Sequence, residues 1–112
     1  MPKYSTLRIY SLNTVFEWDE RKNKANRRKH GVDFIDAARV FEDANRLIEF
    51  DRVGDDGDER FHVLGLAPAG AVLLVVHMYK GVSENEEEII RIISARAARP
   101  REVRRYFQQA AD

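Results

Sequence analysis

Arginine and histidine are the residues of this chain whose types and positions could act on a phosphodiester. Six arginines fall in the run RIISARAARPREVRRY, residues 91–106, and the three histidines are His30, His62 and His77. A guanidinium group offers a planar fork of donors to phosphate oxygens, and an imidazole exchanges protons near neutral pH. Such residues suit metal-independent RNA cleavage, in which the 2′-hydroxyl attacks the adjacent phosphorus while cations hold the growing charge. Each histidine taken singly is more often a packed or surface side chain.

Side-chain alternation predicts that three of these residues form one row across a sheet. If the turn at residues 67–70 closes symmetrically, Arg60 lies opposite His77 on the neighbouring strand. A symmetric turn after Lys80 then brings Arg91 level with His77. Because a slip of one residue reverses the face of every side chain, the row depends on this register.

Two further residues complete the candidate catalytic set. His77, His62, His30 or Glu59 could in principle move the proton, and the leading choice is His77 or Glu59. Glu59 beside Arg60 is also typical of a salt bridge at a strand end. Arg96 lies five positions after Arg91, so in a straight strand the two face opposite ways and only one belongs in the site. The candidate catalytic residues are therefore Arg60, His77, Arg91, Arg96 and Glu59.

A second basic segment, RKNKANRRKH at residues 21–30, contains no acid. Lys22, Asn26 and Lys29 are spaced i, i+4 and i+7, so a helix projects them from one face, with His30 beside them. Lysines and an amide at that spacing suit a nucleic-acid backbone. The alternative is an ordinary solvated helix face.

The charges are segregated although the 19 basic and 19 acidic residues balance. The acids gather at residues 49–59 and 83–88, away from the two basic segments. The basic segments could converge in the fold and form an anion-binding surface on a neutral protein.

Several functional classes are excluded by what the sequence lacks. It has no cysteine, no histidine pair at metal-site spacing, no glycine-rich phosphate loop and no nucleophile elbow. We therefore expect no metal and no cofactor. The first residues lack the apolar run of a signal peptide, and the apolar run AVLLVV is too short to span a bilayer, so we expect a soluble, cytoplasmic protein that does not bind membranes.

The elements that must position these residues form an α+β domain over residues 16–112, preceded by an extension of uncertain order at 1–15 with a possible short strand. Asp19 caps a first helix that stops at Gly31, and Asp33 caps a second helix. Pro100 begins a closing helix. Between the two N-terminal helices and the C-terminal one, the chain contains four predicted strands, at residues 46–51, 60–66, 71–80 and 88–95. We expect these strands to form an antiparallel sheet.

Taken together, the motifs resemble the BrnT family of bacterial type II toxins over Phe16 to about Tyr106. The resemblance is carried by the pattern W-D-x-x-K-x-x-x-N-x-x-K-H-G-V, by ERFHVLG and by R-I-I-S-A-R. The family's polar motif positions fall here on Trp18, Asp19, Lys22, Asn26, Lys29, His30, Glu59, Arg60, Arg91, Ser94, Arg96, Glu102 and Tyr106. We take Lys22, Asn26, Lys29, His30 and Tyr106 as the candidate RNA-binding residues.

The resemblance implies a RelE-like fold and a ribonuclease toxin that blocks translation. It also implies a BrnA-like antitoxin with a ribbon-helix-helix part, which neutralises the toxin, and a complex that represses its own operon. Operator DNA would then be bound only through the complex.

The chain departs from the family pattern at two places. His77 stands where the family has an aromatic hydroxyl on the long strand. Ala97 replaces a basic residue, and the threonine cap of the last helix is lost, which leaves Glu102 without a Ser or Thr partner for a capping box.

Two other functions remain open. A degenerate toxin could still bind an antitoxin or nucleic acid without cleaving, and the changes at His77 and Ala97 favour this reading. A small DNA-binding regulator is the other alternative, although no helix-turn-helix or ribbon-helix-helix pattern is present.

Overall fold

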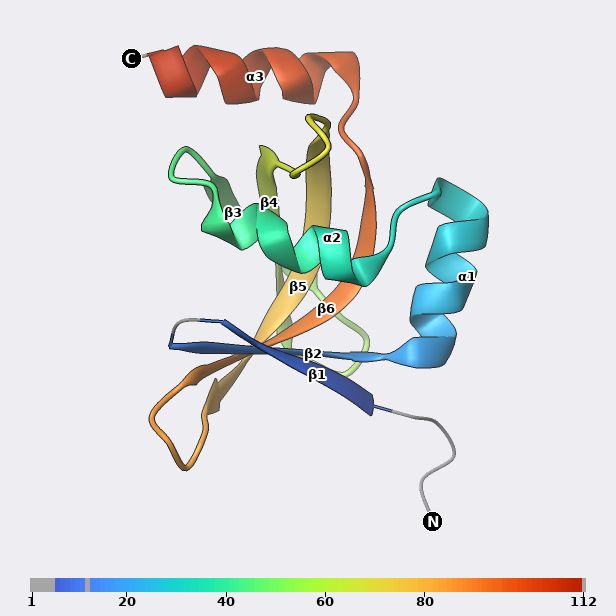
Figure 1. Cartoon of the computed structure of the whole chain (residues 1–112), viewed down its shortest axis with the longest axis vertical. Helices are drawn as coiled ribbons and strands as arrows, with labels where there is room; N and C mark the ends of the chain where they lie inside the picture. Colours follow the sequence, from blue (N-terminus) through green and yellow to red (C-terminus); the bar gives the residue numbers. More distant parts are fainter. Residues whose placement is uncertain (1–5, 12, 112) are drawn as a thin grey trace.

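The computed structural model describes residues 6–11 and 13–111, with side chains as far as Gln109. The elements are β1 (Thr6–Ser11), β2 (Thr14–Asp19), α1 (Glu20–His30), α2 (Phe34–Arg39), the 3₁₀ helix η1 (Val40–Glu42), β3 (Leu47–Val53), β4 (Glu59–Leu66), β5 (Val72–Val82), β6 (Glu88–Ala97) and α3 (Pro100–Ala111). Figure 1 shows α2 lying across the sheet, α1 beside it at one side, and α3 across the upper end. In the part of the chain just defined, no helix is long and apolar enough to cross a membrane.

The predicted helix boundaries are confirmed with one change. Asp19 and Asp33 cap α1 and α2 with their side chains, and Gly31 ends α1 in the left-handed region with φ 72°. Pro100 is the first residue of α3. The second helix, expected over residues 34–41 (FIDAARVF), is shorter, because α2 ends at Arg39 and the chain continues as η1.

The prediction of a four-stranded antiparallel sheet is wrong. The sheet has six strands in the order β1-β2-β6-β5-β4-β3, and β2 runs parallel to β6. The N-terminal segment treated as an extension supplies β1 and the start of β2, while residues 1–5 and 12 lie outside the described residues. The possible short strand at the N-terminus is β1, which forms a hairpin with β2, and β2 joins it to the sheet by pairing with a strand more than seventy residues away. The remaining pairings are antiparallel, as expected.

Apolar side chains cover both faces of the sheet. On the face towards α2, Phe34, Val63 and Val75 belong to the larger cluster, together with Trp18 and Ile92. On the opposite face a smaller cluster lies beneath α3, with Tyr106 packed on Leu64, Leu74 and Val76. We call these the α2 face and the α3 face.

Gly65 allows η1 to pack closely against β4 on the α2 face. A Cβ atom at this position would lie 2.4 Å from Val40 Cγ1, so a side chain here would push η1 away from β4.

Helix α1 is held by buried asparagines, since it lacks an apolar stripe. Asn26 Nδ2 donates to Ala95 O (2.9 Å) and Val32 O (2.9 Å), and Asn26 Oδ1 accepts from Ala95 N (3.1 Å). Asn23 Oδ1 accepts from Phe34 N (3.0 Å) and so ties α1 to α2. The paired part of β2 reaches only Arg91 of β6, so the Asn26 amide takes the place of a strand at Ala95.

Tyr106 and Gln109 hold α3 to the segment after η1. The Tyr106 hydroxyl donates to the Asp43 carboxylate, which also accepts from Leu66 N (2.8 Å). Gln109 Nε2 donates to Asn45 O (2.7 Å). Burial and the bond to Asp43 raise the pKa of Tyr106 to about 12.

We expect Asn26→Ala to lower the free energy of unfolding by about 3 kcal/mol, because it leaves the buried N–H and C=O of Ala95 without partners. Urea unfolding followed by circular dichroism measures this. Lys24→Ala, at an exposed position of the same helix, is the control and should change stability by less than about 0.5 kcal/mol. Equal stabilities for the two variants would show that the amide does not hold the β6 edge.

Candidate functional site

The register of the central strands places Arg60 and Arg91 on the α3 face on either side of Met78, which replaces His77 in the predicted row. Met78 pairs with Arg91, while His77 pairs with Phe61 and Ile92. The row was wrong by one residue because the turn between β4 and β5 has an extra residue and β5 meets β6 through irregular registers.

His77 and Glu59 therefore lie away from these arginines. The His77 ring is 5% exposed and packs edge-to-face on Phe41, with ring centroids 4.9 Å apart. Its burial lowers the pKa of His77. Glu59 lines a hollow with Phe61 and Tyr79. The structure thus does not bring either of the two predicted proton-transfer residues to the arginines.

A β-bulge brings Arg96 to the same face as Arg91, contrary to the expectation that they face opposite ways. Ser94 pairs with Val76 and Ile92 with His77, so Ile93 is the extra residue in β6. The alternation shifts by one at that point. Arg91 and Arg96 lie opposite Met78 and Leu74, respectively, on one side of β5.

Arg91 is held by Glu17, a residue that the sequence analysis did not select. Arg91 Nη1 donates to Glu17 Oε2 (2.9 Å), and Arg8 donates to Glu17 Oε1 (3.0 Å). The Glu17 side chain is only 8% exposed, and two guanidinium groups compensate its charge. The alternation of TVFEWD could have indicated Glu17, because it turns away from the face that holds Phe16 and Trp18.

His62 on the α3 face lies between two carboxylates. Its Nδ1 is 2.9 Å from Asp51 Oδ2 and its Nε2 is 2.9 Å from Glu49 Oε1. The ring can donate a hydrogen bond to both carboxylates only as the imidazolium, in which each nitrogen carries a proton. The imidazolium is also the form of histidine that can act as an acid. A register shift between Phe50 and Arg52 brings Asp51 to the imidazole beside Glu49.

Hydrogen bonds to His62 also set the charge of Asp51. Partial burial acts to raise the pKa of Asp51, but the bonds from His62 and Arg52 outweigh it, so the pKa lies below its usual value. Asp51 is thus held as a carboxylate next to the imidazole. No sequence motif marked this cluster, because Asp51 reaches His62 only through an irregular strand pairing.

Acidic side chains pair with the two remaining arginines of the set. Arg60 Nη2 is 2.9 Å from Asp56 Oδ2 in the turn after β3. Arg96 bonds to both oxygens of Glu102, at 2.8 and 3.0 Å. Glu102 also accepts from Arg99 N (2.8 Å) and so caps α3 without the Ser or Thr of a capping box.

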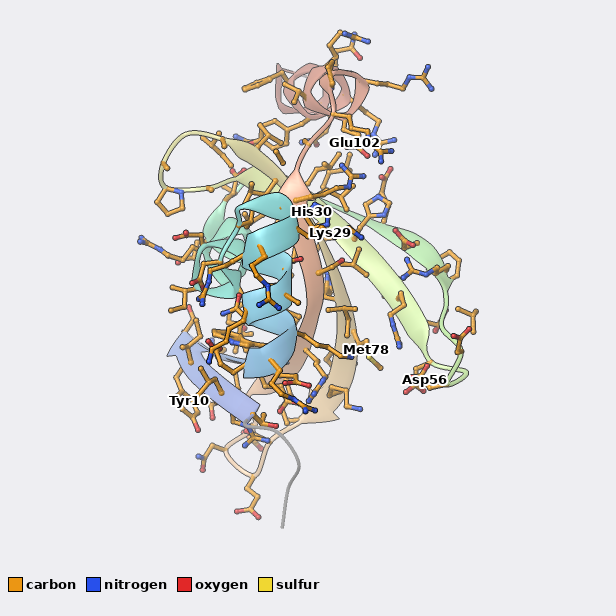
Figure 2. The ribbon with its side chains drawn as sticks, turned by 90° about the vertical axis from the view of Figure 1, so that its right-hand side faces the viewer. Tyr10, Lys29, His30, Asp56, Met78 and Glu102 are labelled. Atoms are coloured by element: carbon orange, nitrogen blue, oxygen red, sulfur yellow. The ribbon has the colours of Figure 1, made fainter. Side chains whose placement is uncertain are left out.

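The predicted RNA-binding residues divide into exposed and buried ones. Lys22, Lys29 and His30 are exposed on α1, and Figure 2 shows Lys29 and His30 at the end of this helix nearer to Glu102. Asn26 is 7% exposed, and its amide is fully engaged in holding β6. Tyr106 is 3% exposed and anchors α3. Both side chains are buried and engaged in hydrogen bonds that hold the fold, which leaves little of either for contact with RNA.

The α3 face is therefore a surface of paired charges. It carries Arg60, Arg91 and Arg96, the cluster of His62 with Asp51 and Glu49, and the buried Glu17. Figure 2 shows the labelled side chains of Met78 and Asp56 on the side of the sheet away from α2. Over residues 6–11 and 13–111, no group of three or more histidine, aspartate or glutamate side chains is arranged to hold a metal ion.

We expect the stability deficit of Glu102→Gln to depend on pH. The hydrogen bonds and charge of Arg96 lower the pKa of Glu102 to about 2, so the pair contributes fully above the unfolded pKa of about 4.5 and is lost as pH falls towards 2. The variant should be less stable by about 1 kcal/mol at pH 6, since solvent screens a pair at the surface. Thermal unfolding between pH 2 and 6 measures this, and a deficit of the same size at pH 2 would contradict it.

Comparison with known proteins shows the family. A sequence model of the family described as "Ribonuclease toxin, BrnT, of type II toxin-antitoxin system" matches residues 18–102. Among solved structures, the chain is similar to the Brucella abortus ribonuclease toxin BrnT, with 26% identity and a TM-score of 0.52 over 73% of this chain and 92% of that one. No curated protein matches. The family model and this structural likeness confirm the resemblance seen in the sequence: the chain belongs to the BrnT family of ribonuclease toxins of type II toxin–antitoxin systems.

Proposed function

We propose that this toxin is a metal-independent endoribonuclease and that the α3 face is its active site. The observation that carries this proposal is the gathering of Arg60, Arg91 and Arg96 on one face with His62. Guanidinium groups can hold a phosphodiester and stabilise the charge on its oxygens, and the imidazole can exchange the protons. These are the groups that 2′-hydroxyl attack requires.

The reaction would proceed by transesterification. The 2′-oxygen forms a bond to phosphorus and loses its proton to a carboxylate of the His62 cluster, Glu49 or Asp51. The bond from phosphorus to the 5′-oxygen breaks, and protonated His62 returns a proton to that oxygen. The products are a 2′,3′-cyclic phosphate and a free 5′-hydroxyl. Arg91 stabilises the phosphorane oxygens while Glu17 fixes its fork in position.

Helix α1 would guide the RNA towards this face. It lies along β6 beyond the end of β2, and Lys22, Lys29 and His30 are exposed on it. Such contacts to the phosphate backbone position RNA without reading its sequence.

As a type II toxin, the protein has a protein antitoxin as its partner. We propose that this antitoxin is BrnA-like, with a ribbon-helix-helix part, and that operator DNA is bound only through the complex. Inhibition of translation in the cytoplasm would follow from RNA cleavage.

A degenerate toxin is the second candidate, favoured by one observation. Each arginine of the face already has an acidic partner, Asp56 for Arg60, Glu17 for Arg91 and Glu102 for Arg96. If these pairs do not open, phosphate cannot bind, and the protein would only bind its antitoxin.

Arg91→Ala tests the proposed active site. We expect purified, antitoxin-free toxin to cleave labelled RNA in excess EDTA and to leave 2′,3′-cyclic phosphate ends. Loss of Arg91 should slow cleavage about 100-fold or more, because a donor to the developing charge is removed. Arg39→Ala is the matched control, since Arg39 is exposed on α2 and pairs with exposed Glu42. Intact RNA from folded toxin that still binds the antitoxin would overturn the proposal.

His62→Gln tests the assignment of the proton-transfer group. We expect it to reduce cleavage by about 100-fold, the usual contribution of general acid–base catalysis. His77→Phe should retain cleavage, because His77 lies on the opposite face of the sheet. The single-turnover cleavage rates of the two variants are compared. Slower cleavage by His77→Phe than by His62→Gln would assign proton transfer to His77 instead.

A further inference from the structure

The α2 face carries a cavity of about 320 Å³ that the proposed reaction does not use. Aromatic rings from four elements line it, those of Phe16, Phe41, Phe61 and Tyr79, together with Ile48 and Ile90. Ile48 and Tyr79 are 46% and 54% exposed, and Phe50 beside them is 52% exposed. Half-exposed apolar side chains around a hollow mark a surface that gains from being covered. We call it the His77 cavity.

His77 presents a hydrogen-bond acceptor to this cavity. Its Nδ1 is 3.2 Å from Val75 O, which can only accept, so Nδ1 carries the proton in the neutral ring. Within the described part of the chain, Nε2 has no hydrogen-bond partner, although the residue is 95% buried and lines the cavity. Among the residues that the structure describes, no fully buried side-chain nitrogen or oxygen lacks a partner, so Nε2 is not fully buried, and the hollow that His77 lines is this cavity. An occupant that offers a donor there would satisfy it.

The surroundings of the His77 cavity are net acidic. Glu88 and Arg46 lie on its rim, and Phe61 and Tyr79 connect it to a hollow that adds Asp58, Glu59 and Lys80. The β3–β4 and β5–β6 turns at this end of the sheet contribute further acids, Asp55 and Glu86. Negative charge disfavours RNA and favours a basic protein segment.

We propose that the His77 cavity is a docking site for the antitoxin. The occupant is a side chain that is apolar for most of its length and ends in a donor, as tyrosine and tryptophan do, in a segment that carries lysine or arginine. This rests on the proposed function only for the identity of the partner. Apolar fit, the free Nε2 and the acidic surroundings together carry the proposal.

Docking and cleavage are separable in this arrangement, because the cavity and the arginines lie on opposite faces of the sheet. The antitoxin would anchor on the α2 face, and blockage of the α3 face would need another of its segments. A toxin with an altered cavity should therefore keep its activity and escape neutralisation.

Two substitutions with matched controls test this. Ile48→Lys places a charge in the cavity wall, and Ile35→Lys makes the same change at an equally exposed isoleucine on α2 (46% and 49% exposed). Glu88→Lys reverses a charge on the rim of the cavity. Its control, Glu84→Lys, makes the same change in the adjoining turn, at a residue that lines a hollow on the α3 face. Affinity for the purified cognate antitoxin is measured by calorimetry, and RNA cleavage is measured on the same samples without antitoxin.

We expect Ile48→Lys and Glu88→Lys to weaken antitoxin binding by at least about tenfold, with the controls and the cleavage rates within about twofold of wild type. Unchanged antitoxin affinity in both test variants would overturn the proposal. So would lost cleavage with unchanged antitoxin affinity, since the cavity would then bind RNA. Weakened binding supports the proposal even if the wild-type toxin cleaves no RNA, so failure of the proposed activity is read separately.

Discussion

The edge of β6 is the feature on which the rest of the structure depends. The first half of this strand pairs with β2 in parallel, and its second half pairs with the Asn26 amide at Ala95. A central strand with an unpaired edge would bury N–H and C=O groups at a cost of about 1 to 3 kcal/mol each. Asn26 thus satisfies the hydrogen-bonding groups at the edge of β6 and at the same time anchors a helix that has no apolar stripe. Helix α1 can therefore carry many exposed basic side chains.

The acidic partners of the arginines differ in how readily they could give way to phosphate. Asp56 lies in an exposed turn, with its side chain 48% exposed, and such a pair is weak. Glu17 is nearly buried between Arg8 and Arg91, and removing one partner from such an arrangement is costly. Substrate binding would thus release Arg60 from Asp56, while Glu17 stays in place and orients Arg91. In the proposed active site, the acids would keep the arginine side chains ordered before RNA binds.

The two faces of the sheet have different chemistry for a simple geometric reason. Alternation along β5 sends Met78 and Val76 to the α3 face, and His77 and Val75 to the α2 face. The histidine that the sequence suggested for catalysis therefore sits among aromatic rings, where its burial lowers its pKa. Its place beside the arginines is taken by His62, which reaches the α3 face from β4.

The sequence by itself determined the features that local interactions control. Asp19, Gly31 and Asp33 marked helix ends, because caps act within one turn, and the four strands β3 to β6 were recognised from alternation and turn residues. The BrnT motifs established the family. Only the tertiary structure decided the parallel pairing of β2 with β6, the bulge at Ile93 and the partners of His62. These depend on packing between distant segments, and a shift of one residue in register exchanges the two faces of a strand.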